Sequence, residues 1–187
     1  MAGSLVLVDT FTVSESTASV IIGGGSQGNS SYNYAMDDTY DVYKLVITNL
    51  RPSADDAPMM RVTKSGSPDN TAAYDRAHRY LKADTSHTNA GSVDGTKFDC
   101  MTTIDAASTA SGNGIYYLFN FASSSEYSFG TYSEGHIQAA ENTVRALHGG
   151  FTHQVASASD GIYVAFNNYA SGSTIEEGKF SLYGLKK

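Results

Sequence analysis

The chain has 187 residues, of which 41% are hydrophobic and 17% charged, and its formal net charge is −7. This length suits one ordinary domain, so we expect residues 1–187 to enclose a single core. An acidic chain lacks the positive surface that neutralises phosphates, so nucleic acid is not an expected partner. The sequence contains no apolar run near the ~20 residues of a spanning helix, so membrane insertion is not expected either.

Cysteine content and the N-terminus indicate the compartment. Cys100 is the single cysteine, which excludes an intrachain disulfide and a Cys-x-x-Cys redox pair and predicts a small buried hydrophobe. The segment Met1–Asp9 has no basic stretch before its short apolar run. It therefore predicts no signal peptide and synthesis in the cytoplasm.

Apolar and polar residues alternate along most of the chain, with Gly, Asn, Asp and Ser between the alternating segments. This pattern predicts an all-β fold, a jelly-roll-like antiparallel sandwich of two packed sheets. In chain order the predicted strands are Leu5–Val8, Ala18–Ile22, Tyr40–Asn49, Met59–Lys64, Tyr74–Leu81, Ile115–Phe121, Ile162–Phe166 and Lys179–Leu185. Pro52 is expected to end the third of them, because proline has no backbone donor.

The segment from Ile137 to Leu147 is compatible with two structures. Ile137, Ala140, Val144 and Leu147 fall at helical spacing, and Gly149 could follow the last turn. The part at 142–147 can equally be a half-buried strand. One short helix on the sandwich would leave the fold class unchanged.

The glycine-rich stretch at 23–31 matches two catalytic patterns. Gly23, Gly25 and Gly28 satisfy G-x-G-x-x-G, and Ser26 lies in a G-x-S-x-G pattern at 24–28. Both motifs need a following helix, whereas the residues up to Tyr34 are turn-like. We therefore interpret the stretch as a loop between strands and expect no enzyme and no cofactor, with a hydrolase or depolymerase as the less favoured alternative.

The sequence predicts no metal site. His148 and His153 are the closest histidine pair, and five positions apart they would point to opposite faces of an extended strand. Acidic pairs such as Asp37–Asp38 and Asp55–Asp56 do not follow the ligand spacing of a calcium loop. They are predicted to be solvated turns.

Three stretches resemble a family of β-sandwich proteins and domains of bacteriophage particles, notably those of marine phages. They are Tyr40–Ser53 (YDVYKLVITNLRPS), Tyr74–Arg79 (YDRAHR) and Ser171–Leu185 (SGSTIEEGKFSLYGL). The family pattern is a Tyr-Asp-x-Tyr strand ending in Asn-Leu-x-Pro, and a closing strand Gly-x-Phe-x-Leu-Tyr-Gly. The resemblance implies a non-enzymatic virion structural protein, foremost a tail-fibre or appendage module for host attachment, with capsid decoration as the alternative. Implied partners are other virion proteins and a host-surface carbohydrate or protein.

Binding residues of sandwiches concentrate in loops at strand ends, so the predicted binding loops are 23–34, 65–71, 83–96 and 123–126. The candidate contact residues in them are Ser26, Gln27, Asn29, Tyr32, Tyr34, Asp69, Asn70, His87, Asn89 and Glu126.

Two predicted strands are apolar or aromatic on both faces, Tyr40–Ile47 and Ile115–Phe121. Burial against a neighbouring copy would explain this, and a homo-oligomer, specifically a homotrimer, is expected for a protein repeated around a particle axis. The alternative is that loops of the same chain cover these strands.

Overall fold

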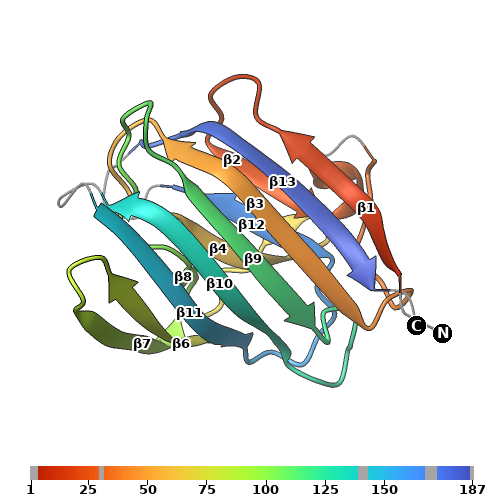
Figure 1. Cartoon of the computed structure of the whole chain (residues 1–187). Helices are drawn as coiled ribbons and strands as arrows, with labels where there is room; N and C mark the ends of the chain where they lie inside the picture. Colours follow the sequence, from red (N-terminus) through yellow and green to blue (C-terminus); the bar gives the residue numbers. More distant parts are fainter. Residues whose placement is uncertain (1–3, 30–31, 139–142, 167–171, 186–187) are drawn as a thin grey trace.

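The computed structural model describes residues 4–29, 32–138, 143–166 and 172–185. They form antiparallel sheets packed against each other, with 59% strand and 1% helix. The predicted all-β sandwich is therefore confirmed. Figure 1 shows a broad sheet in front of a smaller one. No helix in these ranges is long and apolar enough to cross a membrane.

The large sheet has eight strands. Its strands, in spatial order, are β1 (Leu5–Thr12), β13 (Ile175–Leu185), β3 (Val42–Pro52), β9 (Gly112–Phe119), β10 (Ser128–Gln138), β11 (Thr143–His153), β6 (Tyr74–Lys82) and β7 (His87–Gly95). Of the three stretches that carry the resemblance, two lie in the neighbouring strands β3 and β13, and the third lies in β6.

The small sheet lies behind it. Its strands, in spatial order, are β2 (Ser19–Gly23), β12 (Gly161–Ala165), β4 (Met59–Lys64) and β5 (Ser67–Pro68), and β8 (Phe98–Asp99) pairs with β4. From β1 to β4 the chain passes from one sheet to the other at every connection, as in jelly rolls. A short 3₁₀ turn, η1 (Gly25–Gln27), follows β2.

Alternation along the strands of the large sheet divides them into an inner face toward the small sheet and an outer face. On β3, Tyr43, Leu45 and Ile47 are buried while the residues between them are not.

Three predictions about single residues are confirmed. Proline ends β3 at Pro52, as predicted. Cys100 is fully buried, also as predicted. His148 is exposed and His153 buried, which confirms that they lie on opposite faces of β11.

The sequence left helix and strand open for residues 137–147, and the strand alternative is confirmed in the described part of this segment, because β10 runs to Gln138 and β11 begins at Thr143 and pairs with both β10 and β6. Ladder hydrogen bonds on both sides outweigh a weak helical spacing. Residues 139–142 lie outside the described part. The predicted loop at 83–96 is largely strand β7, an edge strand whose polar residues gave no alternation.

Candidate functional site

A cleft opens on the inner side of the large sheet, where the sheet extends past the narrower small sheet. It lies between strands β6, β7, β10 and β11 and the segment 99–103, and its volume is about 300 Å³. We call it the inner cleft. Its lining residues are Arg76, His78, Tyr80, Ala90, Asp99, Met101, Thr102, Thr103, Gln138 and Arg145.

One wall of the inner cleft is an ion-paired group around Asp99. The Arg76 guanidinium lies 3.0 Å from one carboxylate oxygen of Asp99, and the Lys97 ammonium lies 3.2 Å from the other. Arg76 also donates to the backbone carbonyl of Asp99 at 3.0 Å. Two cations therefore pair with one carboxylate, which leaves this wall with a net positive charge.

Thr102 ties the opposite wall to the sheet. Its hydroxyl donates to Gln138 Oε1 at 2.9 Å. Because a hydroxyl has one proton to donate, His136 Nε2, which lies 2.8 Å from Thr102 Oγ1, must donate to that hydroxyl oxygen. Arg145 donates to this hydroxyl at 3.3 Å, and its guanidinium lies 5.4 Å from the ring centre of Tyr80. The polar groups of the cleft are thus held in place before any ligand arrives.

Burial keeps three titratable side chains in and beside the cleft neutral: Glu134, His136 and His78. Burial raises the pKa of Glu134 to about 8, so this carboxyl keeps its proton at pH 7 beside the Tyr116 hydroxyl, to which it is hydrogen-bonded. Burial lowers the pKa of His136 to about 4 and lowers that of His78 as well. His78 Nδ1 lies 2.8 Å from the Tyr132 hydroxyl. Uncharged partners let this core stay dry next to a charged cleft.

The predicted contact residues of the first loop lie outside the inner cleft. Ser26 is exposed in η1, which also contains Gln27. Asn29 Oδ1 accepts a hydrogen bond from the backbone N–H of Ile21 at 2.8 Å, which closes the loop. Tyr32 is exposed, whereas the Tyr34 hydroxyl belongs to a hydrogen-bonded group with Tyr43 and Asp37.

The other predicted residues are spread over separate regions. Asp69 forms an ion pair with Lys64 at 2.7 Å, next to the exposed Asn70. His87 and Asn89 are exposed on β7, and Glu126 lies in the turn before β10. These candidate residues therefore do not converge on the inner cleft.

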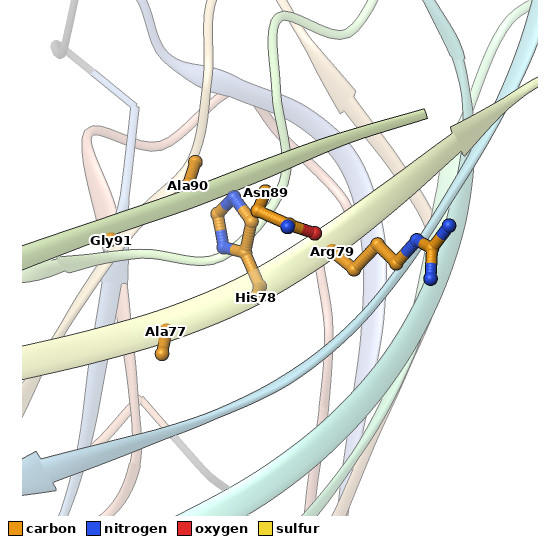
Figure 2. A pocket seen from close by; sticks show the side chains of 6 residues that line it. All are labelled: Ala77, His78, Arg79, Asn89, Ala90 and Gly91. Carbon is orange, nitrogen blue, oxygen red and sulfur yellow. The ribbon is translucent and has the colours of Figure 1, made fainter. Parts of the chain in front are cut away.

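Asn89 lines a shallow recess between β6 and β7, together with Ala77, His78, Arg79, Ala90 and Gly91. Figure 2 shows the His78 ring and the Ala77 methyl on opposite sides of β6, with Arg79 extending away from the other side chains. The recess is a gap along the edge hairpin, with few groups converging on it.

The glycine-rich stretch lacks the structural surroundings that the G-x-G-x-x-G and G-x-S-x-G motifs require. Gly23, Gly24 and Gly25 have φ values of +72°, +80° and +62°, a left-handed conformation that favours glycine. They join the antiparallel strand β2 to the three-residue turn η1. Both motifs need a parallel strand followed by an α-helix.

No protein-family model matches the chain, and no curated protein is significantly similar in sequence. The protein is an antiparallel β-sandwich with a polar, arginine-containing cleft beside its core.

Proposed function

We propose that the protein is a non-enzymatic binding module whose inner cleft takes a polar ligand, namely a hydroxyl- and carboxylate-bearing glycan of a host surface. The cleft itself carries this proposal. It combines cationic side chains at Arg76 and Arg145, amide and hydroxyl groups at Gln138 and Thr102, and the ring of Tyr80. Arginine suits carboxylates, and a tyrosine ring suits the apolar face of a sugar.

The groups in the cleft favour binding over turnover. Asp99 is the one carboxylate among the described residues that line it, and Arg76 and Lys97 both engage it. Glycoside hydrolysis uses a pair of carboxyl groups with distinct roles. Ser26, the serine of the G-x-S-x-G pattern, lies outside the cleft. A hydrolase activity abolished by Ser26→Ala would overturn the proposal.

The proposed setting is the surface of a bacteriophage particle, where the module would serve as a fibre or appendage that contacts the host. The protein would be made in the host cytoplasm and would assemble with other virion proteins. The resemblance of Tyr40–Ser53 and Ser171–Leu185 supports this setting. The exposed apolar side chains on the outer face of the large sheet favour capsid decoration as the second candidate, because such a face could pack on a shell.

Gold-labelled antibodies against the chain, applied to purified particles, test the setting. Label at the tail is expected for an appendage, and label restricted to the head would favour decoration instead. Particles that carry no label would refute the virion setting altogether.

A panel of purified bacterial surface polysaccharides, neutral and uronic-acid-containing, tests the binding function. The matched variants are Ala90→Trp, which fills the cleft from β7, and Ala83→Trp, which adds the same side chain to the exposed turn before β7. We expect Ala90→Trp to weaken binding at least tenfold and Ala83→Trp to leave it unchanged. Equal binding by both variants, or no binding to any member of the panel, would refute the function.

A further inference from the structure

Several apolar side chains on the outer face of the large sheet are exposed in the single chain. Ile115, Tyr117 and Phe129 are 39%, 43% and 41% exposed. Ile115 and Tyr117, in the predicted strand Ile115–Phe121, are therefore not covered by loops of the same chain. The alternative from the sequence, burial against another copy, can now be argued from the arrangement of the face.

In two neighbouring rows of the outer face, strand register places larger side chains on the β9 side of β10, which we call the aromatic half, and smaller ones on the β11 side, which we call the small-residue half. The next row has His148 on β11 and Arg79 on β6. One row across the sheet pairs Lys44 with Tyr117, Tyr117 with Thr131, Thr131 with Gly150 and Gly150 with Ala77. Directly paired residues share a face, so these five side-chain positions lie in line. β10 is the boundary between the two halves.

The neighbouring row repeats this order. It runs through Val42, Phe119, Phe129, Thr152 and Asp75. The rings of Phe119 and Phe129 stack at 5.0 Å between centroids and form a ridge. A groove of about 540 Å³ lies beside this ridge. Its lining includes Asp75, Ala77, Val93, Phe129, Thr131, Gly150 and Thr152.

We propose that a second copy of this chain packs on this outer face, related by a twofold axis that runs along β10. This rotation places β9 over the β11 of the other copy, and β3 over its β6. Tyr117 then faces Gly150 of the partner subunit, and Phe119 faces Thr152 of the partner subunit. The Phe119 side of each ridge then lies over the groove of the other copy, while Phe129, on β10, faces its own counterpart; a twofold interface requires this self-complementarity.

Charge agrees with the same arrangement. Lys44 lies in the aromatic half and Asp75 borders the groove, one row apart across the sheet. The rotation brings Lys44 toward Asp75 of the partner subunit, and it does so twice. Two attractive pairs favour the association of copies that each have a net charge of −7.

The available area matches a modest but specific dimer. The five strands from β3 to β6, at ~4.8 Å spacing, and four outward rows, at ~6.8 Å, give about 650 Å² per copy. Stable specific interfaces start near ~600 Å² per partner, and the largest patch on a typical monomer is roughly 300–600 Å². Two such faces can stack ~10 Å apart with aligned strands, like the sheets of a sandwich.

Thr131 provides the test, because on the proposed axis it faces its own counterpart. It is exposed in the single chain, so a charged replacement should not disturb the fold. Sedimentation of the wild type from 1 to 300 µM should show conversion from 19.9 kDa to about twice that mass. Thr131→Arg and Thr131→Glu should each stay monomeric across this range. Their equimolar mixture should dimerise, because Arg then faces Glu.

Thr88→Arg is the control, since Thr88 is exposed on the opposite side of the large sheet, and this variant should dimerise like the wild type. Circular dichroism of each variant verifies folding. A monomeric wild type at 300 µM, dimers that survive Thr131→Arg, or a mixture that stays monomeric would each overturn the proposal. A trimer, the state favoured by the sequence alone, would also overturn it, because a twofold axis closes at two copies.

Discussion

Glu134→Gln is expected to stabilise the folded protein, and the gain should grow as pH rises. Glu134 is only 6% exposed on the inner face of β10. Its Oε1 accepts a hydrogen bond from the Tyr116 hydroxyl, and its Oε2 has no hydrogen-bond partner among the described residues. Glutamine keeps the size and the acceptor but cannot ionise, so it removes the cost of a buried negative charge.

The size of the effect follows from the pKa of Glu134, which burial raises from the ordinary 4.5 to about 8. Between these values the unfolded chain has lost the proton while the folded chain retains it. Wild-type stability from this group is therefore fully present below pH 4.5 and is lost as pH rises toward 8. Each pKa unit corresponds to ~1.4 kcal/mol, so Glu134→Gln should gain about 2–4 kcal/mol, relative to the wild type, between pH 5 and pH 8.

Urea unfolding of both proteins at pH 5, 6, 7 and 8 measures this difference. The unfolding free energy of the wild type must be subtracted from that of Glu134→Gln at each pH. The reason is that the depressed pKa of His136, about 4, makes wild-type stability rise with pH over part of the same range. That contribution is common to both proteins and cancels. Glu126→Gln, at an exposed turn, is the matched control for the loss of one charge. A difference that stays constant with pH for Glu134→Gln would refute the buried, protonated carboxyl.

Two further predictions concern packing and a buried hydroxyl. Gly149→Ala should cost about 1–3 kcal/mol, because the new Cβ would lie 2.4 Å from the Ala77 carbonyl oxygen, whereas at Gly135 the nearest atom is 3.8 Å away and alanine should be neutral or slightly stabilising. Thermal unfolding of the pair checks this, and equal melting temperatures would contradict it. Tyr43→Phe should cost about 1–3 kcal/mol by urea unfolding, since the Tyr43 hydroxyl donates to the Asp37 carbonyl at 2.8 Å and accepts from the Asp37 N–H at 2.9 Å. An unchanged unfolding midpoint would show that this hydroxyl contributes nothing.

The strands that the sequence predicts well are those with aliphatic or aromatic residues on the inner face. Strand β4 has the predicted bounds, Met59–Lys64, and β13 extends the predicted one only at its start. β7 and β10 went unpredicted for different reasons. β7 is a polar edge strand, and β10 places Gly130, Gly135 and two serines, Ser128 and Ser133, where a strand pattern expects larger side chains. These segments are strands because they pair with neighbouring strands, and local composition does not predict pairing between distant segments.

The site was harder to predict, because the lining of the inner cleft comes from strands rather than loops. Arg76 and Tyr80 share a face of β6, and Arg145 lies on β11, but only the register of these strands brings them together. Thr102 approaches from a separate segment. The sequence prediction followed the expectation that binding residues lie in loops, so it named turns such as 123–126 rather than this cleft.

The cleft is a physical consequence of two sheets of unequal width. Along the inner face of β6 the residues change from Tyr74, fully buried and hydrogen-bonded to the β4 backbone, to Arg76, His78 and Tyr80. Where the small sheet covers the strand, an apolar side chain with one satisfied hydroxyl packs well. Beyond that cover, the inward positions meet water and must be polar or half-exposed. The Arg76–Asp99 ion pair lies between these two regions, so Arg76 both closes the edge of the core and lines the inner cleft.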